Sequence, residues 1–277
     1  MTKILANDGI SQAGIDALTA KGFEVITEKV AQEDLINTIN TENYEVLLVR
    51  SATTVRKDLI DACPHLKVVG RGGVGMDNID VDYAREKGIN VINTPAASSA
   101  SVAELVFAHL FGMVRFLFDS NRQMPMTGDA DFKSLKKSYA NGRELAGKTL
   151  GIIGFGRIGQ EVAKRAIGLG MKVMAHDKFI EEVNITLNFF NGDKKSFTIE
   201  TESLKEVLSN SDFITLHIPK IGDKAVIGAE EIGMMKTGAG IVNAARGGVI
   251  DETALMFALD KEKLAYAGLD VFDNEPT

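Results

Sequence analysis

Residues Gly147–Gly159 read GKTLGIIGFGRIG, and this stretch determines the fold class that the chain is expected to adopt. A short apolar run is followed by Gly-x-Gly-x-x-Gly and then by the helical pattern of Gln160–Gly168. This order is typical of the first βα turn of a doubly wound dinucleotide-binding sheet. Gly154 would allow the tight turn, Gly156 would let a pyrophosphate approach the backbone, and Gly159 would let the helix pack closely on the strand. Free N–H groups and the dipole at the helix start would hold the phosphates.

An acidic residue follows the next strand. Lys172–Ala175 leads into His176 and Asp177, and Asp177 lies 177 − 154 = 23 residues after the first glycine. An acid near this position accepts hydrogen bonds from the ribose hydroxyls and repels the 2′-phosphate of NADP, so NAD is the predicted cofactor. The alternative is that Asp177 only begins the following loop. His176 would either flank the adenosine or serve in packing.

The same alternation of strand and helix runs through the whole chain, which predicts parallel sheets covered by helices on both faces. The fold class is therefore α/β, with two doubly wound parallel-sheet domains, the first flavodoxin-like and the second of the Rossmann type. The strand-to-proline segment Asn93–Ala97 suggests a boundary between domains 1–95 and 96–277. The predicted strands are Lys3–Ala6, Glu24–Ile26, Val46–Val49, Lys67–Gly70, Asn90–Ile92, Thr149–Ile153, Lys172–Ala175, Phe213–Leu216, Gly240–Asn243 and Tyr266–Leu269. Helices include Ser11–Ala20, Ile79–Lys87, Gln160–Gly168 and Glu252–Asp260.

Three segments of the second domain are unusual. The predicted helix Ser101–Ser120 is apolar on almost every side, so it should be buried on more than one side, in a core or against a second subunit. Gln123–Gly142 is polar and predicts a long loop or arm. Val183–Glu202 predicts a hairpin with its turn at Asn191-Gly192, without a readable purpose.

A weak internal repeat links the two domains. Asn43–Thr53 and Ser211–Lys220 each place a buried strand before a polar turn. Each is followed by a helix, a strand and Arg-Gly-Gly, at Arg71 and at Arg246. Two similar sheets would place both arginines at carboxyl ends of strands, where α/β proteins bind ligands. Chance recurrence of three residues is the alternative.

Composition excludes several classes of protein. The net charge of −7 disfavours a nucleic-acid partner, and the histidines and the single cysteine, Cys63, show no metal-ligand spacing. Cys63 is expected to be a buried small residue, in a reducing compartment. No apolar run approaches the roughly 18–20 residues that span a bilayer. The N-terminus has no signal-peptide pattern, so a cytoplasmic location without membrane contact is predicted.

Four motifs in order resemble the D-2-hydroxyacid dehydrogenase family over nearly the whole chain. They are GKTLGIIGFGRIG, LHIPK (Leu216–Lys220), NAARGGVIDE (Asn243–Glu252) and AGLDVFDNEP (Ala267–Pro276). VRSAT (Val49–Thr53), VGRGGVGMDNID (Val69–Asp80) and NTP (Asn93–Pro95) resemble most the branch that acts on D-3-phosphoglycerate. The resemblance implies a discontinuous catalytic domain, with the cofactor domain inserted in it, and a homodimer that pairs through the cofactor domain.

The resemblance also implies roles for individual residues. Arg246 would clamp and polarise the 2-oxo acid, and Glu275 would pair with the catalytic histidine. Residues expected to line the NAD site, besides the three glycines and Asp177, are Arg157, Ile158, Ile218, Ala244, Ala245, Asp270 and Val74. Residues expected to contact the substrate are Arg50, Ser51, Arg71, Gly72 and Gly75. Simple packing is an alternative for Ile218 and Val74, an ordinary loop position for Asp270 and Glu275, and a solvated surface position for the N-terminal arginines.

One departure from the family concerns its catalytic histidine, which stands in a Pro-His-x-Gly context after the Glu-Pro motif. None of the four histidines fits that context, and we expect the sequence to be truncated after Thr277. NAD-dependent oxidation of D-3-phosphoglycerate, a reaction of serine biosynthesis, is the predicted function. Reduction of hydroxypyruvate or glyoxylate is the first alternative, and an NADH-sensing corepressor is a distant one.

Overall fold

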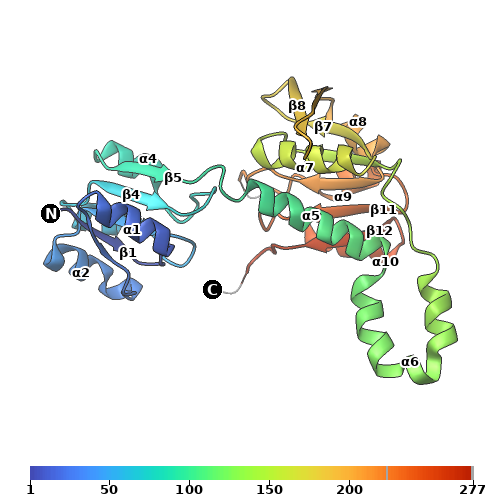
Figure 1. The fold of residues 1–277 in the computed structure, drawn as a ribbon, viewed down its shortest axis with the longest axis horizontal. Coiled ribbons are helices and arrows are strands. Elements are labelled where there is room, and N and C mark those ends of the chain that lie inside the picture. The colour runs from blue at the N-terminus through green and yellow to red at the C-terminus, as the bar shows by residue number, and fades with distance from the viewer. Residues whose placement is uncertain (223, 276–277) are drawn as a thin grey trace. The chain divides into compact units, whose positions relative to one another are not determined.

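The computed structural model describes residues 1–222 and 224–275, and the chain divides into two compact units, Met1–Ser98 and Ser99–Thr277 (Figure 1). The first unit contains a five-stranded parallel sheet of order β2-β1-β3-β4-β5, the flavodoxin-like order. Its strands are β1 (Lys3–Ala6), β2 (Glu24–Ile26), β3 (Val46–Val49), β4 (Val68–Arg71) and β5 (Asn90–Asn93). Its helices are α1 (Gln12–Ala20), α2 (Leu35–Glu42), α3 (Lys57–Ala62) and α4 (Val81–Glu86), with the 3₁₀ turn η1 (Gln32–Asp34) before α2.

The two faces of this first sheet differ. Leu5, Leu47 and Val69 are fully buried in a core that α2, α3 and α4 complete. On the opposite face Leu48, Gly70 and Ile92 line a cavity of about 670 Å³, and Ile92 is 57% exposed. Neighbouring residues of a strand point to opposite faces, so buried and half-buried positions alternate along β3.

The second unit contains another five-stranded parallel sheet, of order β12-β11-β10-β6-β7. Its strands are β6 (Thr149–Ile153), β7 (Lys172–His176), β10 (Phe213–Leu216), β11 (Ala239–Asn243) and β12 (Leu264–Leu269). One face packs against α5 (Ser99–Val114) and α7 (Arg157–Gly168). The other packs against α8 (Leu204–Asn210), α9 (Ala229–Met234) and α10 (Glu252–Asp260). The predicted fold class is therefore confirmed, and each predicted strand lies within two residues of its observed bounds.

Of the two alternatives for Gln123–Gly142, a long loop or an arm, the loop is wrong for most of its length. Helix α6 spans Leu117–Tyr139, bends at Asp131, and extends away from the sheet of its unit (Figure 1). None of its described side chains is buried within the chain. A helix that buries no side chain within its own chain needs no continuous apolar stripe, so the sequence pattern did not reveal it.

The predicted helix Ser101–Ser120 is interrupted, because Phe116 adopts a left-handed φ of 53° between α5 and α6. Within the chain α5 buries one stripe of residues and not several sides: Ser99, Ala103, Val106, Phe107, Leu110 and Val114. Phe111, on its other side, is 39% exposed. No single helix of the described residues is long and apolar enough to cross a membrane, although the bent pair of α5 and α6 meets that criterion by length and composition.

The predicted hairpin is confirmed. Strands β8 (Glu182–Asn188) and β9 (Lys194–Glu200) pair antiparallel, and Gly192 in the connecting loop has a φ of 90°. Ile185 anchors the hairpin in the core beside α7. Beyond β9, Thr201 forms a parallel bridge to Ala175 of β7, so the hairpin continues the edge of the main sheet.

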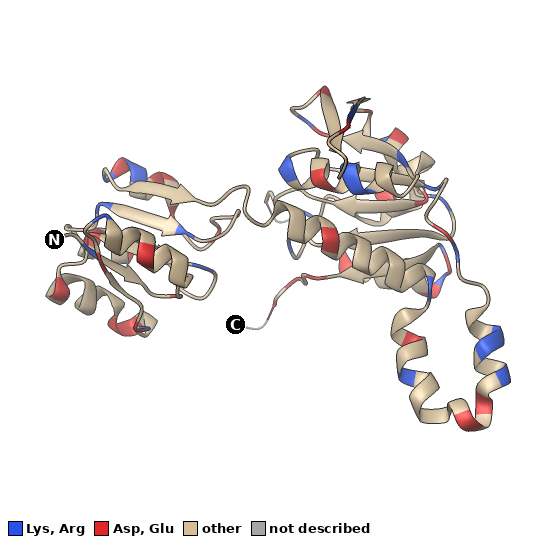
Figure 2. Ribbon diagram, viewed as in Figure 1, with Lys and Arg blue, Asp and Glu red and all other residues tan. Residues whose placement is uncertain are grey.

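The remaining expectations from composition concern charge and Cys63. Both acidic and basic residues lie on α6 and on α7 (Figure 2). Cys63 is buried as expected, and this burial raises the pKa of its thiol to about 11. The thiolate needed for reactivity is therefore disfavoured.

Candidate functional site

The glycine loop after β6 has the geometry of a phosphate cradle. Gly154 has a φ of +92°, and a Cβ atom placed on it would lie 2.5 Å from the carbonyl oxygen of His217. A Cβ atom on Gly159 would overlap the carbonyl oxygen of Gly154. A Cβ atom on Gly156 would meet no protein atom within 4 Å. The chain itself therefore requires glycine at 154 and 159, whereas the space beside Gly156 is open to a ligand.

The start of α7 adds unpaired donors to this loop. Gly156 is the N-cap and provides no side-chain hydrogen bond. The first amide of α7 that forms a helical hydrogen bond is that of Gln160, which donates to the Gly156 carbonyl oxygen at 2.9 Å. The N–H groups of Arg157 and Ile158 have no hydrogen-bond acceptor among the described residues. Such free amides at a helix N-terminus bind anions, so this end of α7 fits a dinucleotide pyrophosphate.

Asp177 lies directly after β7, beside the glycine loop. Its Oδ2 accepts the N–H of Phe155 at 2.7 Å, and its Oδ1 accepts the N–H groups of Phe179 at 2.9 Å and Ile180 at 3.2 Å. A carboxylate offers about four acceptor sites, so capacity remains for a ribose hydroxyl. The ring of His176 is held by the end of the hairpin, because its Nδ1 lies 2.8 Å from the carbonyl oxygen of Glu202.

The segment after β10 lines the other side of the loop. Ile218 packs against Gly154, with its Cγ2 2.8 Å from the position of a Cβ atom there. His217 is half-buried; its Nε2 lies 3.0 Å from Thr215 Oγ1, and its Nδ1 is buried without a hydrogen-bond partner among the described residues. Burial lowers the pKa of His217 from 6.5 to about 4, so the imidazole is neutral at neutral pH.

His217 should make the protein acid-sensitive. Between pH 6.5 and about 4 the unfolded chain binds a proton that the folded chain excludes, so the free energy of unfolding falls as the pH falls. The contribution is fully present above pH 6.5, and about 3 kcal/mol of it should be lost by pH 4. Urea unfolding of the wild type and His217→Gln across this range should show a smaller pH slope in the variant. The exposed His65→Gln is the control, and equal slopes in all three proteins would contradict the assignment.

The turn that carries Arg246 follows β11 and is organised by Asn243, which is 2% exposed. Asn243 accepts the N–H of Ala245 at 3.0 Å and donates to the carbonyl of Arg246 at 2.9 Å. The Arg246 guanidinium donates to the Ala245 carbonyl at 2.7 Å. Ala244, Ala245 and Arg246 are half-buried at the carboxyl edge of the sheet. Sequence reasoning gave Asn243 no role, although it begins the NAARGG motif.

Asp270 and Glu275 follow β12, the neighbouring strand. The N–H of Asp270 donates to the Asn243 carbonyl at 3.0 Å, which joins the two strand ends. Asn274 has a left-handed φ of 55°, and Glu275 turns back so that its Oε1 accepts the N–H of Phe272 at 2.8 Å. The second unit thus brings Arg246, Asp270 and Glu275 to the carboxyl end of its parallel strands, the end that also carries the glycine loop.

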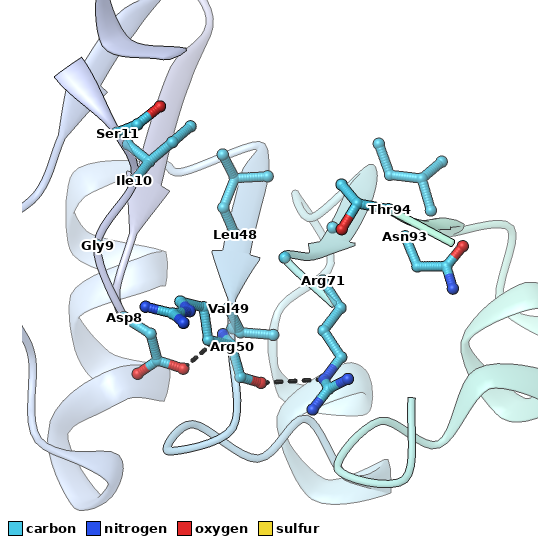
Figure 3. Close-up of a pocket in the computed structure, with 13 residues that line it drawn as sticks. Asp8, Gly9, Ile10, Ser11, Leu48, Val49, Arg50, Arg71, Asn93 and Thr94 are labelled. Atoms are coloured by element: carbon cyan, nitrogen blue, oxygen red, sulfur yellow. Dashed lines mark hydrogen bonds between the residues drawn. The ribbon is translucent and has the colours of Figure 1, made fainter. Parts of the chain in front are cut away.

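In the first unit, Asp8 organises the loop after β3 (Figure 3). Its carboxylate accepts the N–H groups of Arg50 at 2.6 Å and Thr53 at 3.0 Å, and the Thr53 hydroxyl at 2.7 Å. Burial opposes ionisation of Asp8, but these hydrogen bonds outweigh it and lower its pKa. The Arg50 side chain is left exposed, next to Ser51.

Arg71, Gly72, Val74 and Gly75 lie in and after β4. The Arg71 guanidinium donates to the Arg50 carbonyl at 3.2 Å (Figure 3). It also donates to the Gly75 carbonyl, so it connects two loops. Gly72 donates to the Val49 carbonyl at 2.9 Å, and Val74 is 37% exposed.

A cavity of about 400 Å³ beside this loop is lined by Lys29, Arg50 and Ser51, together with Asn7, Asp8, Gly9, Thr27 and Ala52. Lys29 was not singled out from the sequence, because it lies in a segment without a motif. It places a second cation at the predicted substrate region, which can receive an anionic group. Among the described residues, no three His, Cys, Asp or Glu side chains are grouped so as to hold a metal.

Relatives with named activities align with all or nearly all of this chain. The D-3-phosphoglycerate dehydrogenase of Methanocaldococcus jannaschii is 42% identical over 279 aligned residues, which include 100% of this chain and 50% of the relative. The hydroxypyruvate reductase of Thermotoga maritima is 41% identical over 99% of this chain and 84% of its own length. The chain thus spans about half the length of the first relative and most of the second.

A solved structure and two family models also match this chain. The crystal structure of the TT0316 protein from Thermus thermophilus superposes with a TM-score of 0.83 at 30% identity, covering 100% of this chain and 84% of that one. Residues 4–184 match the model of the D-isomer specific 2-hydroxyacid dehydrogenase catalytic domain, and residues 107–277 match the model of its NAD-binding domain. With the glycine loop, Asp177 and the Arg246 turn in place, this chain belongs to the D-isomer specific 2-hydroxyacid dehydrogenase family.

Proposed function

We propose that the protein catalyses NAD-dependent oxidation of D-3-phosphoglycerate to 3-phosphohydroxypyruvate, a step of serine biosynthesis. The observation that carries the proposal is the cavity in which Lys29 and Arg50 lie with Ser51. A substrate phosphate is more highly charged than a hydroxyl group, and two cations with a hydroxyl donor suit it better than a single arginine would.

Different residues of this chain would bind the cofactor and the substrate. The N–H groups at the start of α7 would hold the pyrophosphate, and Asp177 would accept the ribose hydroxyls. Bound NAD supplies the hydride acceptor for C2 of the substrate. Ile218, Ala244, Ala245 and Asp270 would line the groove around it.

Arg246 would hold the substrate carboxylate and the neighbouring oxygen with its planar guanidinium. Glu275 would orient the family's catalytic histidine, which takes the hydroxyl proton. Arg71 would brace the loop of Val74 and Gly75 through the contacts described above, so that Arg50 and Gly72 keep a fixed position at the substrate.

Hydroxypyruvate reduction is the second candidate. The Thermotoga maritima relative supports it, because this chain covers 84% of that protein. The two candidates differ in one chemical group of the substrate, the phosphate, so they can be separated by one comparison.

The test uses the protein expressed from its complete gene. We expect kcat/KM for phosphohydroxypyruvate to exceed that for hydroxypyruvate, and Lys29→Met to lower the first value about tenfold more than the second, the loss of about one charge-assisted contact. Lys21→Met, an exposed lysine after α1, is the matched control. A wild-type preference for hydroxypyruvate, with no selective effect at Lys29, would establish the second candidate instead.

We further propose a homodimer formed through the cofactor domain. Helix α6 buries none of its described side chains within the chain. Phe111, Leu117, Phe118, Met126 and Phe132 are each at least 39% exposed on α5 and α6. Several exposed large apolar side chains on two consecutive helices are typical of an interaction surface. Light scattering on the protein from its complete gene should give twice the mass of one chain, and a monomer at micromolar concentration would contradict the proposal.

A further inference from the structure

We propose that Lys220 is a positioning residue that ties the segment Asp270–Glu275 to the turn that carries Arg246. This inference deepens the proposed function and rests on it, because Glu275 and Arg246 are the two catalytic residues assigned to this chain. They follow different strands, β12 and β11, so their relative placement depends on contacts between the two loops.

The first contact is an ion pair. Lys220 Nζ lies 3.3 Å from Asp273 Oδ1, and the two side chains are 39% and 48% exposed. Lys220 ends the LHIPK motif after β10, and Asp273 lies 53 residues further along the chain. The pair therefore joins the segment after β10 to the loop that holds Glu275.

A second contact holds the backbone of Asp273. Its N–H donates to Glu252 Oε1 at 2.6 Å, and Glu252 is the first residue of α10, six residues after Arg246. Asp273 is thus held through its side chain by Lys220 and through its backbone by Glu252. Both contacts are charge-assisted, which makes them stronger than neutral hydrogen bonds of the same geometry.

The two glycines after Arg246 make this approach possible. A Cβ atom on Gly247 would overlap the carbonyl oxygen of Phe272. A Cβ atom on Gly248 would overlap Lys220 Nζ and would lie 3.1 Å from Asp273 Oδ1. Gly247 and Gly248 therefore have a packing role. Because they lack side chains, Lys220 and the segment that carries Glu275 can lie directly against the turn of Arg246.

Glu275 reaches its position through this segment. The left-handed Asn274 turns the chain, and the Glu275 carboxylate accepts the N–H of Phe272, the residue before Asp273. The local turn sets the direction of the carboxylate within the segment. The contacts of Asp273 set the position of the segment against Arg246. Loss of the Lys220 contact would leave the turn formed but free to move relative to Arg246.

The test combines hydrogen exchange with kinetics on the protein from its complete gene. In Lys220→Met, we expect amide exchange at Phe272 and Asp273 to accelerate about fivefold, the upper range for an exposed ion pair. We expect kcat to fall by a similar factor, about fivefold, with the Kd of NADH within about twofold. Lys224→Met, an exposed lysine of the same loop, should change none of these quantities.

The charge-reversed pair Lys220→Asp with Asp273→Lys should recover most of the protection and most of kcat, which a merely structural loss would not. Unchanged exchange in Lys220→Met, failure of the reversed pair to recover, or a large loss of NADH affinity would overturn the proposal. If the wild type turns over no 2-oxo acid, the proposed function fails. The exchange measurement still decides whether Lys220 holds the segment.

Discussion

Gly156→Ala is expected to weaken NADH binding by about 100-fold or more, close to 2.7 kcal/mol, without loss of stability. In the folded chain a Cβ atom at this position meets no protein atom within 4 Å, and the backbone is extended, with φ −71° and ψ −161°. Alanine adopts that conformation without strain. The added methyl group would instead occupy the space that the pyrophosphate needs beside the N–H groups of Arg157 and Ile158.

The measurement is a fluorescence titration with NADH alongside a thermal melt. Gly168→Ala is the matched control, because it lies at the other end of α7 and its Cβ atom also meets nothing within 4 Å. Gly154→Ala and Gly159→Ala cannot serve here, since both would collide with the protein's own backbone and change the fold together with the affinity. Wild-type affinity in Gly156→Ala would place the pyrophosphate elsewhere. A lowered melting temperature would mean that the glycine has a structural role.

The glycine loop also shows which features can be predicted from a sequence. Its strand, turn and helix are consecutive, so local spacing alone predicts them. The repeat is similar: Arg71 ends β4, and Arg246 lies three residues after β11. Each of these strands is fourth in its sheet, counted from the edge strand β2 or β7. The correspondence favours a shared architecture over chance recurrence.

Other features depend on contacts between distant residues and could not be predicted. Asp8 orders the loop of Arg50, which lies 42 residues away, and Lys220 meets Asp273 across 53 residues. No spacing rule links such positions before the sheet order is known. Helix α6 was missed for the opposite reason, because it makes so few contacts within the chain that no apolar period marks it. Lys29 joins the site only through the cavity that it shares with Arg50.

Arg246→Ala is expected to lower kcat by about 10³-fold, near 4 kcal/mol, with the Kd of NADH within about twofold. The Arg246 side chain starts from a turn that Asn243 fixes at the carboxyl edge of the sheet, beside the loop of Asp270 and Glu275. There its guanidinium would hold the substrate carboxylate and stabilise charge on the oxygen at C2, which develops in the transition state. The residues expected to bind the cofactor, the glycine loop and Asp177, follow β6 and β7, so NADH binding should not depend on this side chain.

The variant Arg246→Lys distinguishes the effect of the positive charge from that of the planar guanidinium geometry. An ammonium group keeps the positive charge but cannot hold two oxygens in one plane, so most of the loss should remain, about 10²-fold or more in kcat. Arg85→Ala, on the exposed side of α4, controls for the removal of a guanidinium and should behave as wild type. Single-turnover kinetics with NADH and phosphohydroxypyruvate would measure the chemical step directly. Near-normal turnover in Arg246→Lys would mean that Arg246 contributes only its positive charge to the reaction. Normal turnover in Arg246→Ala, or a large loss of NADH binding, would remove it from the catalytic role.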